Sequence, residues 1–239
     1  MLSIPNKVDL RELVHKEVFK SSIRISLHDI SELPKELDCP QLQFFYMRNA
    51  RDFLDNFFAR ISKLKVLHLV GLNLFSAASL HLLVNLQTLY IELCKLKDVD
   101  FIGEMKKLEI LRIHSSYILE LPKETCNLTR LKLLDLNDCG NLEAIPPNVI
   151  STLTKLEELY LCSSGANIKW EVEGLNVLDD LKGLLHLTTF EISIGDAKRP
   201  LVVDKVEEIV ESPTEDSGST SLHTILNKAI FRFPTDVDD

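Results

Sequence analysis

The sequence contains few of the residues that build cross-links, metal sites and flexible linkers. Among 239 residues there are 5 cysteines, 8 glycines and 1 tryptophan. An odd number of cysteines without a Cys-x-x-Cys pair disfavours both a disulfide framework and a zinc site. Reduced thiols in the cytosol fit this usage better, so we predict a cytoplasmic protein with no metal and no other cofactor.

Long apolar runs and an excess of basic residues are lacking as well. No stretch approaches the roughly 18 apolar residues of a membrane span, and the first residues lack the apolar run of a signal peptide. We therefore expect no membrane span. Lysine and arginine together number 27 against 36 acidic residues, which gives a net charge of −9. A nucleic-acid surface needs clustered positive charge, so we predict no nucleic-acid partner.

The sequence is rich in leucine at a fixed spacing. The pattern Leu-x-x-Leu-x-Leu occurs in five strong copies, with three weaker copies beside them. Its first positions step by 20, 22, 22, 22, 23, 25 and 31 residues. Steps of roughly 20 to 29 residues are typical of leucine-rich repeats. The first positions are Ser22, Leu42, Leu64, Leu86, Leu108, Leu131, Leu156 and Leu187.

Two periods kept in one register predict the fold. The Leu-x-Leu period of two sends both leucines inward, as in a short strand, and stacked parallel copies bury a continuous core. Later in each copy, groups such as Phe101, Ile102, Met105 and Leu108 have the spacing of an apolar helical stripe. We predict an α/β leucine-rich-repeat solenoid, with a curved parallel sheet on the concave side and short helices and loops on the convex side. The strands should centre near residues 45, 67, 89, 111, 134 and 159.

The two ends of the chain depart from the repeat. We predict an N-terminal cap or linker at 1–21, the solenoid at 22–195 and an acidic, partly disordered tail at 196–239. The tail contains 10 acidic and 5 basic residues. Its last apolar residues, from Leu222 to Phe233, have helical spacing and form either a cover for the last coil or a tail without a partner. Trp170, in the step of 31 residues, is expected to pack that insertion.

A small polar residue follows eight positions after the first leucine in four successive copies. These residues are Cys94, Ser116, Cys139 and Ser164. Such side chains can turn inward and bond backbone groups of neighbouring coils. We therefore predict a structural role for Cys94 and Cys139, in preference to a redox or ligand-binding role.

Candidate chemistry beyond binding is weak. His68 and His114 lie two coils apart, about 10 Å, which is too far for one zinc ion. Asp135, Glu157 and Glu158 are predicted to form a solvated acidic patch, and the histidines are predicted to be solvated too. No nucleophile elbow, cysteine-protease signature or phosphate-binding loop occurs. We predict that the protein is not an enzyme and has no catalytic, cofactor-binding or metal-binding residues.

The outward residues of the concave strands are the best candidates for function. They are free from packing, and solenoids use this curved face to bind partners. Tyrosine and arginine are frequent anchors of protein interfaces. We therefore predict a protein partner. The candidate protein-binding residues are Tyr46, Arg48, His68, Tyr90, Glu92, Arg112, His114, Asp135, Asn137 and Tyr160, and Cys162 and Glu191 extend the same two rows.

Two segments carry a family resemblance. Residues 131–146, LKLLDLNDCGNLEAIP, and residues 25–34, ISLHDISELP, resemble the cytoplasmic repeats of plant coiled-coil, nucleotide-binding, leucine-rich-repeat disease-resistance proteins. The closing Leu-Pro recurs at Leu121-Pro122. The resemblance covers about residues 20–195. It implies a truncated immune receptor, because the phosphate-binding loop of the family's nucleotide-binding domain is absent.

The resemblance implies a function in plant defense and innate immunity. In this family the repeats sense a pathogen effector or a modified host protein, and in a full-length receptor they also contact its own nucleotide-binding domain. A generic cytoplasmic leucine-rich-repeat adaptor or scaffold is the alternative. An adaptor would need an additional recruitment module, and neither 1–21 nor 196–239 resembles one. An open reading frame with a phosphate-binding loop directly upstream would favour the receptor.

Overall fold

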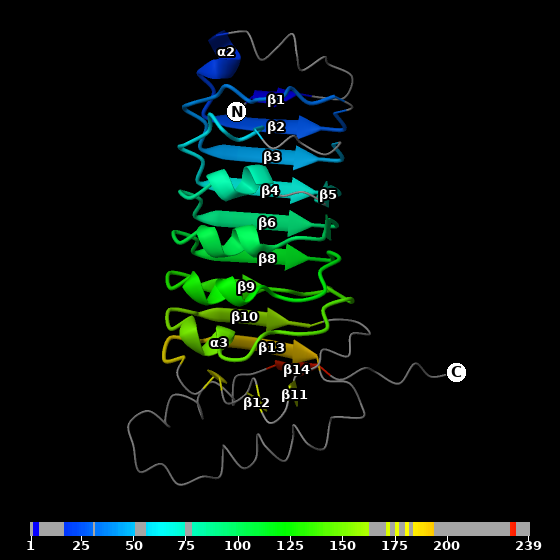
Figure 1. Ribbon diagram of the computed structural model, residues 1–239, viewed down its shortest axis with the longest axis vertical. Helices are drawn as coiled ribbons and strands as arrows, with labels where there is room; N and C mark the ends of the chain where they lie inside the picture. The colour runs from blue at the N-terminus through cyan, green and yellow to red at the C-terminus, as the bar shows by residue number, and fades with distance from the viewer. Residues whose placement is uncertain are drawn as a thin grey trace, which may run out of the picture.

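The computed structural model describes residues 2–4, 17–30, 32–50, 56–74, 78–162, 171–172, 175–176, 180–181, 184–193 and 230–232. Its main feature is a ten-stranded sheet in the order β1-β2-β3-β4-β6-β8-β9-β10-β13-β14, with every neighbouring pair parallel. The strands stack along the long axis of the molecule (Figure 1). The ten strands are β1 (Leu2–Ile4), β2 (Arg24–His28), β3 (Phe44–Arg48), β4 (Val66–Val70), β6 (Thr88–Glu92), β8 (Ile110–His114), β9 (Leu133–Asp135), β10 (Glu158–Leu161), β13 (Thr189–Ser193) and β14 (Ile230–Arg232).

Short elements return the chain from one strand to the next. They include three 3-10 helices and a one-turn α-helix on the side opposite the open face of the sheet (Figure 1). A repeat of 22 residues must hold a strand and the two connections at its ends. The residues that remain suffice for about one helical turn. The remaining elements are α2 (Glu17–Lys20), β5 (Asn73–Leu74), η1 (Ala78–Leu82), β7 (Lys95–Leu96), η2 (Asp100–Glu104), η3 (Lys123–Asn127), α3 (Val149–Thr152), β11 (Glu171–Val172) and β12 (Leu175–Asn176).

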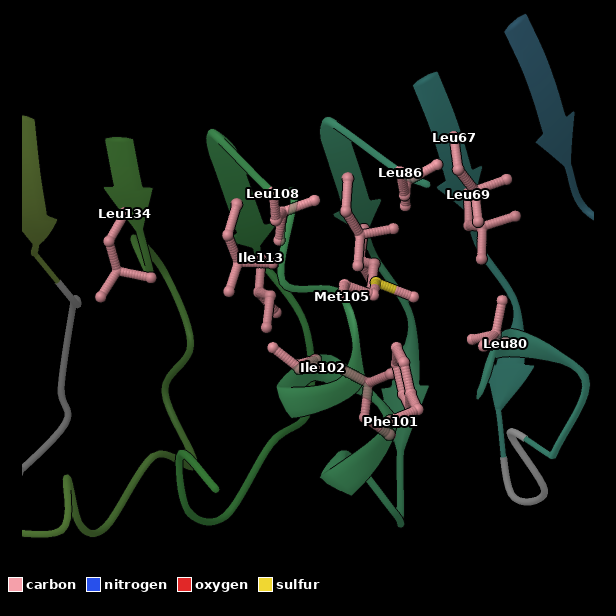
Figure 2. Packing of buried hydrophobic residues seen from close by; sticks show 14 of the residues in the cluster. Leu67, Leu69, Leu80, Leu86, Phe101, Ile102, Met105, Leu108, Ile113 and Leu134 are labelled. Atoms are coloured by element: carbon pink, nitrogen blue, oxygen red, sulfur yellow. The ribbon is translucent and has the colours of Figure 1, made fainter. Parts of the chain in front are cut away.

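The predicted α/β leucine-rich-repeat solenoid is confirmed. Strands β3, β4, β6, β8, β9 and β10 lie at the six predicted centres. Inward strand residues such as Leu67 and Ile113 point toward Leu80, Phe101 and Ile102 of the return segments (Figure 2). All five side chains are buried. The sheet and the return segments therefore enclose one continuous core between them. Along the solenoid, each coil covers the apolar face of its neighbour.

The sheet has one strand more at each end than the repeat pattern indicates. Strand β1 pairs with β2 in the segment predicted as a cap, and β14 pairs with β13 in the segment predicted as a tail. The helical stripe expected up to Phe233 is wrong at residues 230–232, which form a strand. The exposed backbone edge of β13 explains this pairing, because an unpaired strand edge is a template for another strand. Trp170 and Ser164 lie outside the described residues.

The small side chains after each strand form the predicted ladder between coils. The Ser116 hydroxyl donates to the His114 carbonyl at 3.0 Å and accepts from the Cys94 amide at 3.1 Å. The Cys139 thiol donates to the Ile113 carbonyl of the preceding coil at 3.1 Å. The buried Cys94 thiol accepts a hydrogen bond from the Leu72 backbone amide of the preceding coil at 3.4 Å. The predicted structural role of Cys94 and Cys139 is therefore confirmed.

The cysteines fall into a buried and an accessible class. Burial raises the pKa of Cys39 to about 12 and those of Cys94 and Cys139 to about 11, whereas Cys126 and Cys162 are partly exposed. At pH 8 a thiol of pKa 11 is ionised to about one part in a thousand, and the thiolate is the reactive form. Mass spectrometry after iodoacetamide treatment should find Cys126 and Cys162 labelled first, and the other three only after unfolding. Rapid labelling of Cys94 in the folded protein would contradict this packing.

The residue seven positions after the first position of each repeat, just past the strand, adopts a left-handed backbone. Its φ lies between 48° and 68° in six successive coils. Gly, Asn and Asp tolerate this region best, whereas a bulky apolar residue is subject to roughly 1–2 kcal/mol of steric strain there. At Gly71 a side chain would also collide with the Asn49 Oδ1 atom, 2.4 Å from the position of its first carbon. We call these residues the edge column: Asp29, Asn49, Gly71, Leu93, Ser115 and Asp138.

Candidate protein-binding face

The open face of the sheet carries parallel rows of outward side chains. The sheet register aligns the second outward residue of each strand with that of the next. The sequence-predicted residues of this row are therefore adjacent, as expected. We call it the central row: Ser26, Tyr46, His68, Tyr90, Arg112, Asp135, Tyr160 and Glu191.

A continuous series of ring contacts runs from His28, beside the central row, through Tyr46 and His68 to Tyr90. The centroids of His28 and Tyr46 are 5.1 Å apart, those of Tyr46 and His68 are 4.9 Å apart and those of His68 and Tyr90 are 5.4 Å apart. The Arg112 guanidinium carbon lies 5.5 Å from the Tyr90 centroid. Such ring pairs and cation–π contacts hold the side chains in place, so a partner binds them with little further loss of rotamer entropy.

His68 is less exposed than the sequence suggests. Its side chain is 22% exposed, and its Nε2 atom lies 3.2 Å from the Glu92 carboxylate on the next coil. Burial lowers the pKa of His68, although the Glu92 charge acts in the opposite direction. The expectation of a solvated histidine is therefore wrong here, because the rings of Tyr46 and Tyr90 cover it from both sides. His114 is more exposed and lies 3.5 Å from Asp138.

Asp135 is the largest departure from the predicted site. The expected solvated carboxylate is 5% exposed, and it accepts a hydrogen bond from the Asn137 amide at 3.0 Å. Arg112 Nε lies 2.7 Å from Asp135 Oδ2, which makes an ion pair between adjacent coils. Arg112 cannot therefore be removed without consequence for folding, because the carboxylate would stay buried without its cation.

The last part of the face is acidic and internally bonded. The Tyr160 hydroxyl donates to Glu158 Oε2 at 2.7 Å, and this hydrogen bond, with burial and nearby carboxylates, raises the pKa of Tyr160 to about 12. Asn137 Oδ1 accepts the Cys162 amide at 2.7 Å, so Asn137 links two coils. The Asn137 side chain therefore has a structural role between coils. Arg48, another predicted residue, is exposed at the other end of the face.

The sequence prediction missed a row of partly exposed residues beside the central row. They occupy the first outward position of each strand, directly before the buried leucine. Reading that position in each repeat would have found them. Several are apolar, so the face is more hydrophobic than the predicted residues alone indicate. We call this the first row: Arg24, Phe44, Val66, Thr88, Ile110, Leu133, Glu158 and Thr189.

Metal-binding groups and membrane-spanning helices are both absent from the part of the chain that the structure describes. None of its histidine, cysteine, aspartate and glutamate side chains form a group of three or more that could hold a metal ion. Within the same residues, no helix has the length and apolarity needed to cross a bilayer. The arrangement is that of a contact surface, with rings and one tethered cation at its centre.

Comparisons with known proteins give a partial likeness and a shared fold. The chain is 36% identical over 114 residues to the disease resistance protein At4g27190 of Arabidopsis thaliana, across 46% of this chain and 11% of that protein. It is 35% identical over 90 residues to the platelet glycoprotein Ib alpha chain of Mus musculus, across 38% of this chain and 12% of that protein. No family model matches.

Among solved structures, an internalin of Listeria monocytogenes (inlF) superimposes with a TM-score of 0.64 at 17% identity, over 96% of this chain and 60% of the internalin. At that identity the likeness shows the leucine-rich-repeat fold alone. The likeness to the plant protein is closer in sequence, but the match spans only about a ninth of its length.

Proposed function

We propose that the chain is the protein-recognition module of an intracellular plant immune receptor, which senses a pathogen effector or a modified host protein. The observation that carries this proposal is the series of ring contacts from His28 through Tyr46 and His68 to Tyr90, which ends at Arg112. Tyrosine and arginine held on rigid strands are the side chains that most often anchor protein interfaces. The similarity to a plant disease resistance protein supports the immune role. In a full-length receptor, the same solenoid would also contact the nucleotide-binding domain.

Tyr90 and Tyr160 provide the test, because both are partly exposed and neither lies in the apolar core. A partner is first captured by the full chain from extracts of healthy and infected plant tissue, and then purified. Replacing either tyrosine with alanine should weaken binding by about 1–2 kcal/mol, or roughly 5- to 30-fold, if it anchors the interface. Calorimetry measures the affinity and circular dichroism checks the fold.

Lys155→Ala is the control, since Lys155 is exposed on a return segment away from the sheet. In a full-length receptor carrying these repeats, the tyrosine variants should also weaken or misregulate the cell-death response. Folded tyrosine variants that bind and signal like the parent would place recognition on another surface. A partner that is neither an effector nor a host protein altered by infection would favour the adaptor role.

A further inference from the structure

A second surface lies on the flank of the solenoid, where the chain leaves β6 and β8. Lys95 and Tyr117 pair in parallel, and the Leu96 amide donates to the Tyr117 carbonyl at 2.9 Å. In the two paired segments, 93–97 and 117–119, alternate residues point inward. These are Cys94, Leu96 and Ile118, which are buried. The residues between them are exposed. We call them the flank patch: Leu93, Lys95, Lys97, Tyr117 and Leu119.

Four residues of the flank patch, all but Leu93, line a hollow between adjacent coils. The hollow has a volume of about 1060 Å³ and is lined by residues 95–100, 117–120 and 122–124, with Pro146 from the next coil. Leu96, Val99 and Ile118 provide apolar lining. Beyond Tyr117 the next coil bonds to a different segment: the Glu143 amide donates to the Leu119 carbonyl at 2.8 Å. Segment 117–119 is thus bonded to the coils on both of its sides.

Leu93 gives an independent indication that this flank is used. It belongs to the edge column, where the other coils place Asp, Asn, Gly or Ser. Its φ is 53° and its side chain is 63% exposed, so the residue accepts backbone strain without gaining burial. Tyr117 and Leu119 are 44% and 49% exposed. A strained backbone and a cluster of exposed apolar side chains are both features of interaction surfaces.

The charges at the patch select the kind of partner. Lys95 and Lys97 are exposed and form no ion pair with any residue in the described part of the chain. Four carboxylates also line the hollow, those of Asp98, Asp100, Glu120 and Glu124, together with Lys123. Carboxylates of a partner are therefore attracted where they face Lys95 and Lys97 and repelled where they face these four side chains.

We propose that the flank patch is a second protein-docking surface, separate from the open face, and that it binds an extended segment of a partner protein. The segment places apolar side chains over Leu93, Tyr117 and Leu119, and carboxylates over Lys95 and Lys97. The flank-patch residues stand two positions apart along segments 93–97 and 117–119. Every second side chain of an extended partner segment has the same spacing, so these side chains can each face one patch residue. The docking proposed for the flank patch does not depend on the immune function proposed for the open face.

The test uses the full chain and a phage-displayed library of random 12-residue peptides. Selected peptides should combine leucine or aromatic residues with aspartate or glutamate, and fluorescence anisotropy measures their affinity. The double variant Lys95→Glu/Lys97→Glu should lower that affinity at least tenfold, and Leu93→Asn severalfold. Tyr90→Ala, on the open face, should leave it unchanged.

Leu93→Asn also separates docking from folding. Asparagine tolerates a positive φ, so this variant should melt at a temperature no lower than that of the parent while binding the peptide less well. A purely structural leucine would instead lower the melting temperature when replaced. Selection of no acidic–apolar peptide, or of peptides that lose affinity with Tyr90→Ala and not with the lysine variant, would overturn the proposal.

Discussion

Replacing Leu134 with aspartate should lower the free energy of unfolding by several kcal/mol and unfold more than one coil. Leu134 is fully buried in β9, and the register places Leu111 and Leu159 on its two sides. A carboxylate at this position is either ionised without a partner or protonated in an apolar layer, and both states are unfavourable. Since each coil is stabilised mainly by its neighbours, the loss spreads along the solenoid.

Leu133→Asp is the matched control, because Leu133 precedes Leu134 in the same strand but belongs to the first row of the open face. There the new carboxylate remains in contact with water, so the loss should be about 1 kcal/mol or less. Urea unfolding followed by circular dichroism measures both variants. Similar midpoints for the two would show that β9 does not alternate between core and open face.

The repeat spacing predicts most of this fold because each copy repeats the same physical problem. A strand with two inward leucines cannot bury them alone, and a fixed step brings the next strand beside it in register. Leu67, Leu89 and Leu111 therefore align across β4, β6 and β8, as the pattern indicates. The period of two also identifies the outward residues of the central row.

Exposure cannot be predicted from that period, because it depends on side chains from other coils. Asp135 points outward in its strand, yet Arg112 from the preceding coil and the Asn137 amide shield it. His68 is similarly covered by the rings of Tyr46 and Tyr90. The Asn137 contact lies within one coil, but the contacts with Arg112, Tyr46 and Tyr90 arise from coil stacking, and a single repeat contains no sign of them.

Backbone conformation at Leu93 escapes prediction for a related reason. Leucine has no preference for positive φ, so only its place in the edge column, beside Gly71 and Ser115, indicates the left-handed turn. Residues 230–232 illustrate a different limit. Their apolar spacing fits a helical stripe, but pairing with the exposed edge of β13 requires a strand.

The ion pair between Arg112 and Asp135 should have the second large effect, on stability and on binding together. In the parent, Asp135 is 5% exposed beside Arg112, and Arg112→Ala removes this cation and leaves the Asn137 backbone amide as a donor to the carboxylate. We expect a loss of about 1–3 kcal/mol in the free energy of unfolding, reduced from the value of a fully buried pair because the Arg112 side chain is 39% exposed. Arg24→Ala is the control: its guanidinium also lies over a ring, 4.8 Å from the Phe44 centroid. Without a buried carboxylate to leave behind, it should lose about 0.5 kcal/mol or less.

A double-mutant cycle separates the pair from its two members. Asp135→Ala removes the buried charge, so adding Arg112→Ala to it should cost far less than Arg112→Ala alone, with a coupling energy of about 1–2 kcal/mol. If Arg112 anchors a partner, Asp135→Ala should also weaken binding, because the guanidinium loses the contact that holds it beside Tyr90. Urea unfolding and calorimetry of the four proteins measure both quantities. Additive stability losses would show that the two side chains do not act as a pair, and unchanged affinity in Asp135→Ala would show that the pair does not position Arg112 for binding.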